Sequence, residues 1–326
     1  MCMKNLTREE FSQIYENQFL PILTPLEQKR KIDKKKSKPF EILCVIFGLS
    51  IIITSFLPNT PFPEIRIVSV ILLIITIFIA GNVCPGIRDD VKKEVITKIL
   101  SLFWQFYLTT DKYPITAKTI KEMGLFPSFT DIYCDDVIEG IHKDLNLTIS
   151  ETHLFHSEQI GKHAHIFDDF HGLLLKIQMH KKFTGKTIVG VNHNIRKLKG
   201  FEQVNLEDIE FAKNLKVFST DQIEARYILT TAFMQRLFWL GEFFANNGDA
   251  VSNKSNYAAF SQEDLLVSAA FIDGNVYLFV PTKEDFFEIS ESESILNVDK
   301  YYDVYCQIQH ILSIVEYMKF DMKLGL

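Results

Sequence analysis

Two long apolar stretches dominate the first quarter of the chain. Residues Phe40–Leu57 and Ile67–Val83 contain a single charged residue, Glu41, at the edge of the first stretch. A helix of this length spans about 27 Å, close to the roughly 30 Å hydrocarbon core of a bilayer. The connector Pro58–Glu64 is short and rich in proline. The pattern predicts a two-helix transmembrane hairpin, with helices at about 40–57 and 67–83; a pair of buried core helices is the alternative.

Positive charge lies at the two outer ends of this predicted hairpin. Lysine and arginine crowd the segment Lys29–Lys38, and three more basic residues follow between Arg88 and Lys93, whereas the connector side carries only Arg66. The positive-inside rule then predicts a multi-pass membrane protein with both termini and the main domain cytoplasmic.

Amphipathic helical patterns flank the hairpin. Residues Thr7–Leu20 place apolar side chains on one face, Thr7 and Glu10 have the spacing of a capping box, and Pro21 is expected to end this helix. A second helix is expected from Asp89 to Tyr107.

The rest of the chain alternates between strand and helix patterns. Short stretches rich in β-branched and aromatic residues lie between Ile132 and Phe218, and Phe183–Gly185 suggests a hairpin turn between two of them. Helices are expected over Asp221–Asn246 and from about Val298 to Lys319, and a second hairpin turns at Asp273-Gly274. This order predicts an α+β fold with an antiparallel sheet. The predicted domains are an amphipathic helix and basic arm (1–39), the hairpin (40–87) and an α+β domain (88–326).

Charge is divided unevenly along the 326 residues. Up to Pro39 there are nine Lys or Arg and five Asp or Glu, a net charge of +4. The remaining residues must therefore carry a net charge of −10 to give the total of −6. The basic arm suits a lipid bilayer as a partner, whereas an acidic body argues against nucleic acid. The five cysteines show no paired spacing, and no cofactor is predicted.

Five of the nine histidines lie between Thr152 and Gly172. His163 and His165 have a known metal-ligand spacing, and Asp168 or His171 could close a site. The alternative is a solvated loop, which we favour because Gly161-Lys162 interrupts the run.

Another motif lies in the segment Val204–Leu237, where the chain resembles a family of bacterial membrane proteins classed only as a domain of unknown function. The matching residues are Leu206–Phe211, Val217–Asp221, Glu224–Leu229 and Phe233-Met234, together with Phe11, Pro21, Glu27, Arg30, Phe170 and Gly172. The resemblance implies two N-terminal transmembrane segments and a cytoplasmic α+β domain, with no established activity. It also implies a location in the bacterial inner (plasma) membrane and a membrane or envelope protein as partner, one similar to LemA.

Four residues of this motif are candidates for a partner or structural site: Asp221, Glu224, Arg226 and Tyr227. A helix cap and one buried or half-buried ion pair explain them without any chemistry, and a ligand role for Arg226 is the alternative. The predicted function is a non-enzymatic, membrane-tethered module that binds a protein partner or lipid. The alternative is a metal-assisted hydrolase that uses the histidine-rich segment 153–171.

Overall fold

The computed structural model describes residues 6–56, 64–83, 88–103, 105–109, 115–180, 182–191, 195, 198–247, 266–282, 286–287 and 294–320. The chain divides into two compact units. Among the described residues, the helical unit takes those within Asn5–Val95 and Ile289–Lys300, and the sheet unit takes those within Ile96–Glu288 and Tyr301–Leu326. The sheet unit thus begins eight residues after the start of the predicted α+β domain at residue 88, and residues 294–300 belong to the helical unit.

The helical unit begins with α1 (Arg8–Ile14), a π-helical turn η1 (Tyr15–Phe19) and α2 (Leu20–Phe56). The predicted capping box is confirmed, because the Thr7 side chain accepts from the Glu10 backbone and the Glu10 carboxylate accepts from the Thr7 N–H. The prediction that Pro21 ends the helix is wrong. The π turn changes the hydrogen-bonding register just before Pro21, so a residue without an N–H is tolerated there.

α3 (Glu64–Val83) packs against the second half of α2. Ser50 Oγ and Ser69 Oγ are 3.0 Å apart and join the two helices. Ser69 and Thr76 are buried, whereas many apolar side chains of both helices are exposed, among them Val45, Ile46, Leu49, Ile52, Ile53, Ile67, Val68, Ile74 and Phe78. The two helices therefore meet along small polar side chains.

No helix in the described part of the chain has a stretch that is both long enough and apolar enough to cross a membrane. This finding contradicts the predicted multi-pass location in the inner membrane, with cytoplasmic termini and main domain. It also leaves the predicted transmembrane hairpin without support, and the connector 57–63 lies outside the described residues.

A buried carboxylate ties α2 to the second segment of the helical unit. Glu27 is 2% exposed, and its carboxylate accepts from Arg30 Nε at 2.8 Å and from the Ile295 backbone N–H at 3.2 Å. Lys31 Nζ lies 3.6 Å from the same carboxylate. The hydrogen bond from Arg30 is the main cause that lowers the pKa of Glu27 to about 2. Glu27 is therefore held ionised by two cations of its own helix and by one backbone N–H from the second segment of the unit.

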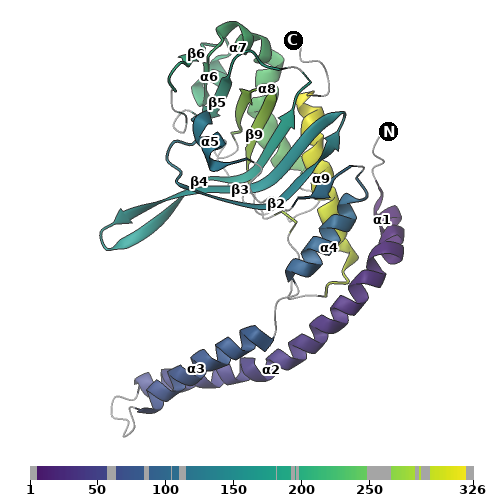
Figure 1. Ribbon diagram of the computed structural model, residues 1–326, viewed down its shortest axis with the longest axis vertical. Coiled ribbons are helices and arrows are strands. Elements are labelled where there is room, and N and C mark those ends of the chain that lie inside the picture. Colours follow the sequence, from purple (N-terminus) through teal and green to yellow (C-terminus); the bar gives the residue numbers. More distant parts are fainter. Residues whose placement is uncertain are drawn as a thin grey trace. The chain divides into compact units, whose positions relative to one another are not determined.

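The sheet unit is built on an antiparallel sheet with the strand order β1-β2-β3-β4-β9-β8-β5-β7-β6 (Figure 1). In chain order the strands are β1 (Tyr107–Leu108), β2 (Asp131–His142), β3 (Leu145–Ile160), β4 (His163–Gln178), β5 (Thr187–Val191), β6 (Glu202–Gln203), β7 (Leu215–Ser219), β8 (Ser268–Ile272) and β9 (Asn275–Pro281). The helices are α4 (Arg88–Leu100), which begins in the helical unit, α5 (Ala117–Met123), α6 (Ile209–Asn214), α7 (Gln222–Ile228), α8 (Thr231–Asn247) and α9 (Val298–Met318). The predicted α+β class with an antiparallel sheet is confirmed.

Apolar side chains are buried on the two faces of this sheet. On one face, Leu154, Phe170 and Leu174 share a core with Ile120 and Met123 of α5. On the other face, the side chain of Phe271 in β8 contacts Phe233 of α8, with ring centroids 5.8 Å apart. The α8 and α5 helices therefore cover opposite faces of the sheet.

Strands β3 and β4 extend well beyond their other neighbours and form a two-stranded arm that projects from the sheet (Figure 1). β2 pairs with β3 only as far as Phe155, and β9 pairs with β4 only from Gly172 onward. The segment predicted as a solvated loop is therefore a hairpin of two strands. We define the arm as residues 156–171.

Of the two hairpins predicted from the sequence, one is present and the other is not. Asp273 and Gly274, both with positive φ, join β8 to β9 and confirm the predicted hairpin. The hairpin predicted at Phe183–Gly185 is wrong, because β4 pairs with β3 and β9 whereas β5 pairs with β7 and β8.

The Glu27 network predicts a pH dependence of stability. Because the pKa of Glu27 is lowered from its ordinary 4.5 to about 2, ionised Glu27 stabilises the fold above pH 4.5, and this contribution is lost as the pH falls toward 2. The contribution is at most about 3 kcal/mol. Urea unfolding of wild type and Glu27→Gln should differ most near pH 7 and converge near pH 2. A difference that stays constant between these pH values would contradict the assignment.

Candidate functional site

The histidine-rich segment lies on the arm and at its base. His163 and His165 follow the turn at Gly161-Lys162 and share one face of the arm, because alternate residues of a strand point the same way. His171 stands eight residues from His163 on the same strand, which corresponds to roughly 26 Å. His163 and His171 therefore cannot bind one ion.

The remaining polar side chains at the base of the arm are paired with one another. His153 Nε2 lies 2.7 Å from Asp168 Oδ1, and His156 Nδ1 lies 2.6 Å from Asp169 Oδ2. Asp169 is the extra residue of a β-bulge, since Leu154 pairs with Phe170 whereas the next residue, Phe155, pairs with Asp168. These contacts connect the two strands where the arm begins.

No group of three His, Cys, Asp or Glu side chains that could hold a metal ion is found among the described residues. His171 is engaged elsewhere, because its Nδ1 lies 2.8 Å from the Thr282 carbonyl oxygen. Asp168 faces His153, on the side of the arm opposite to His163 and His165. The structure therefore does not bring the four predicted metal candidates together.

Two of the described cysteines, the buried Cys134 and the half-buried Cys306, are poorly suited to act as nucleophiles. Burial raises the pKa of Cys134, and burial likewise raises the pKa of Cys306. A raised pKa disfavours the thiolate, which is the nucleophilic form of cysteine.

The second group of candidates, at α7, is placed by a network of caps. The Asp221 carboxylate accepts from the backbone N–H groups of Ile223 and Glu224 and so caps the helix, as predicted. The Glu224 carboxylate accepts from Thr184 N at 2.7 Å, Thr184 Oγ1 at 3.0 Å and Gly185 N at 2.6 Å. Glu224 therefore anchors the loop that leads into β5.

Gly185 makes this close approach possible. A Cβ atom at this position would lie 2.7 Å from Asp221 Cβ and 3.2 Å from Glu224 Oε2. Any larger residue would push the loop away from α7, so the loop and the helix are matched to one another.

Arg226 and Tyr227 have a different role from Asp221 and Glu224. The exposed Arg226 guanidinium donates to Gln222 Oε1 at 3.2 Å and to the Asn205 carbonyl oxygen at 3.4 Å. The expected ion pair of Arg226 is not found among the described residues. Tyr227 is 61% exposed and Ile223, one turn earlier on α7, is 71% exposed. This side of α7 presents apolar surface and one cation to the solvent.

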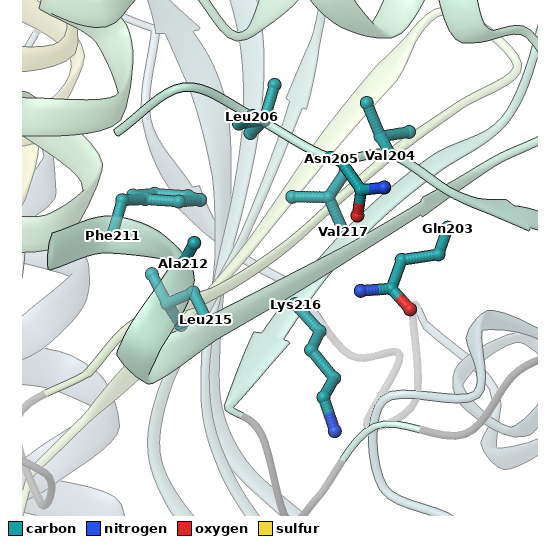
Figure 2. A pocket seen from close by; sticks show the side chains of 9 residues that line it. All are labelled: Gln203, Val204, Asn205, Leu206, Phe211, Ala212, Leu215, Lys216 and Val217. Atoms are coloured by element: carbon teal, nitrogen blue, oxygen red, sulfur yellow. The ribbon is translucent and has the colours of Figure 1, made fainter. Parts of the chain in front are cut away.

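A small pocket of about 150 Å³ lies beside this motif (Figure 2). It forms where the chain after β6 separates from β7, and α6 closes its end. Its lining residues are Gln203, Val204, Asn205, Leu206, Phe211, Ala212, Leu215, Lys216 and Val217. Its lining is mixed, because Lys216 is charged, Gln203 and Asn205 are amides and the remaining side chains are apolar, a composition that suits the binding of another molecule.

Two hydrogen bonds connect α7 to the wall of this pocket. Gln222 Nε2 donates to the Gln203 carbonyl oxygen at 3.1 Å, and Arg226 Nη2 donates to the Asn205 carbonyl oxygen. On the other border, α6 contributes Phe211 to the lining and begins with Ile209, which is 73% exposed. We call the pocket together with Ile209, Ile223, Arg226 and Tyr227 the pocket surface.

Sequence reasoning placed Asp221, Glu224, Arg226 and Tyr227 in one motif but did not find the pocket. The pocket depends on the separation of two neighbouring strand segments, for which the sequence carries no motif. The sequence signal for this surface was the presence of Ile209 and Ile223 in the first turns of two capped helices. Both isoleucines are exposed, so packing in the core does not explain them.

The second half of the chain has a match among sequence families. Residues 168–320 match the family described as "Protein of unknown function (DUF3137)". These are 153 of the 326 residues, and they run from β4 to the end of α9. The predicted resemblance is confirmed as a resemblance to a domain of unknown function. Its membrane part is not supported.

Comparison with other proteins adds one distant structural likeness. The chain is similar to the crystal structure of the mycobacterial trehalose monomycolate transport factor A, TtfA, at 8% identity over 71% of this chain and 97% of that chain. The TM-score of 0.32 is too low to support an argument about fold or function. No curated protein sequence matches the chain.

The contacts of α7 predict that Glu224 matters more for stability than Arg226. Glu224→Ala removes the acceptor of three hydrogen bonds and should lower the free energy of unfolding by about 1–2 kcal/mol. Arg226→Ala should change it by less than about 0.5 kcal/mol, because the guanidinium is exposed. Urea denaturation of both variants at one pH measures the difference. The reverse order would mean that Arg226 has a buried acidic partner.

Proposed function

We propose that this chain is a non-enzymatic binding module that takes a protein partner on the pocket surface. The observation that carries the proposal is a small pocket with a mixed apolar and polar lining, bordered by two short helices that expose Ile209, Ile223 and Tyr227. Exposed apolar side chains grouped around a hollow are typical of protein interaction sites.

The size of the pocket favours a side chain over a free small molecule. Ligand pockets usually measure about 300–1,000 Å³, whereas this pocket measures about 150 Å³. A volume of that size accommodates one apolar side chain of a partner, and the surrounding exposed residues extend the contact. Binding energy at such interfaces is concentrated in a few anchors in pockets.

Arg226 and Tyr227 supply the polar part of the proposed contact. Arginine and tyrosine are enriched among the residues that dominate binding energy at interfaces. The Arg226 guanidinium already donates to three oxygens, two of Gln222 and the carbonyl oxygen of Asn205, so it is partly ordered before a partner arrives. A partner with an apolar anchor and a nearby acidic or carbonyl group fits this arrangement.

The alternative of a metal-assisted hydrolase at residues 153–171 finds no support in the described contacts. His163 and His165 stand at the exposed end of the arm, and His153 and His156 are paired with carboxylates at its base. Hydrolysis by a metal needs several ligands converging on one ion and an open position for water.

A photo-crosslinking experiment tests the proposal. The full chain with p-benzoylphenylalanine in place of Tyr227 should give one discrete protein adduct in the native cells, because the partner covers this position. The matched control places the same amino acid at Tyr133 of β2. Tyr133 is 55% exposed, and β2 lies near the edge of the sheet opposite to β7 and β6.

A second change ties the adduct to the pocket. Ala212→Phe fills the pocket from its exposed border and should abolish the Tyr227 adduct while the chain stays folded. An adduct of equal yield at Tyr133, or a Tyr227 adduct that survives Ala212→Phe, would contradict the proposal.

A further inference from the structure

The arm exposes an unpaired strand edge that the pocket surface does not involve. Between His163 and Phe170, β4 pairs with β3 on one side and with no strand of the described chain on the other. β3 has a shorter unpaired edge, from His156 to Ile160. Unpaired edges present a row of backbone donors and acceptors and are templates for further strand pairing.

The arm does not carry the usual protection of such an edge at its centre. Ile166 is 68% exposed and Phe167 is 40% exposed, and they point to opposite faces of the arm. The Phe167 ring stacks on His156 of the neighbouring strand, with centroids 5.4 Å apart. Both faces of the arm therefore offer apolar contact beside the free edge.

The two ends of this edge carry side chains of opposite charge character. Lys162, His163 and His165, which supply a cation and imidazole donors, stand at the tip, and Asp168 and Asp169 stand toward the base. An antiparallel copy of the same strand reverses this order. Each tip then lies beside the acidic end of the other copy, and opposite charges across a strand pair stabilise it.

We propose that the free edge of β4 pairs with the same edge of a second copy of this chain. In an antiparallel pair, side chains that lie directly opposite one another point to the same face of the sheet. The two-fold axis of such a pair must therefore relate one residue to the same residue of the second copy, and it cannot pass between two residues. An axis at Ile166 brings the two Ile166 side chains together and places His165 opposite Phe167 of the second copy. The two arms form a four-stranded antiparallel ribbon.

The free edge of β3 fits a second copy less well. Its five residues, from His156 to Ile160, carry one carboxylate, Glu158, and no lysine or arginine. An antiparallel copy would therefore bring no opposite charges together, and the pairing would be shorter. The β-bulge at Asp169 limits the β4 pairing at the base of the arm.

The experiment measures the mass of the full chain by sedimentation equilibrium. Wild type should form a dimer of two 37.7 kDa chains in a concentration-dependent way. An acidic-arm variant, Lys162→Glu with His165→Glu, puts carboxylates at both ends of the edge and should be monomeric. A basic-arm variant, Asp168→Lys with Asp169→Asn, should also be monomeric, and its asparagine retains an oxygen for His156.

Mixing the two variants gives the decisive result. Acidic and basic arms are complementary, so the mixture should contain a heterodimer although each variant alone does not dimerise, an outcome that misfolding of either variant cannot produce. The control Ser157→Glu with Gln159→Glu adds charge to exposed positions of β3 and should still dimerise. A monomeric wild type, a dimer that persists in the acidic-arm variant, or a mixture without heterodimer would overturn the proposal.

Discussion

The sheet unit depends on the way one strand, β4, is shared between two partners. β4 pairs with β3 along its whole length but with β9 only over Gly172–Gln178. The second half of β4 therefore lies in the middle of the sheet, buried on both faces, and the first half leaves it as the arm. The change occurs at Gly172, where a Cβ atom would lie 2.2 Å from the Val280 carbonyl oxygen. Only a residue without a side chain allows β9 to approach β4 at this point.

This arrangement separates the two proposed interaction surfaces. The arm starts at β4, near the middle of the strand order, and the pocket lies at the edge formed by β7 and β6 (Figures 1 and 2). The arm offers backbone pairing and alternating charge, which suits another strand. The pocket surface offers a hollow and exposed apolar side chains, which suits an inserted side chain. Loss of one surface should therefore leave the other in place.

The elements that sequence reasoning predicted correctly depend on local chemistry. Asp273-Gly274 specifies a tight turn, and Asp221 caps a helix, because each needs only its neighbours along the chain. The arm was missed because its residues 157–168 are exposed on both faces, so its strands show no alternation of apolar and polar residues. Pro21 was misjudged because the π turn before it depends on the packing of the helical unit. The pocket was missed because it exists only where the chain after β6 separates from the neighbouring β7, and no sequence motif specifies that separation.

Hydrogen exchange of the backbone amides in the variant Gly172→Ala tests most directly the claim that β4 begins to pair with β9 at Gly172. The account predicts faster hydrogen exchange in residues 173–178 and 276–280, and a loss of about 1–3 kcal/mol in the free energy of unfolding, because the added Cβ must displace a backbone carbonyl. Gly200→Ala is the control, since Gly200 also has positive φ but a Cβ there meets no atom within 4 Å. Equal protection and stability of the two variants would contradict the account.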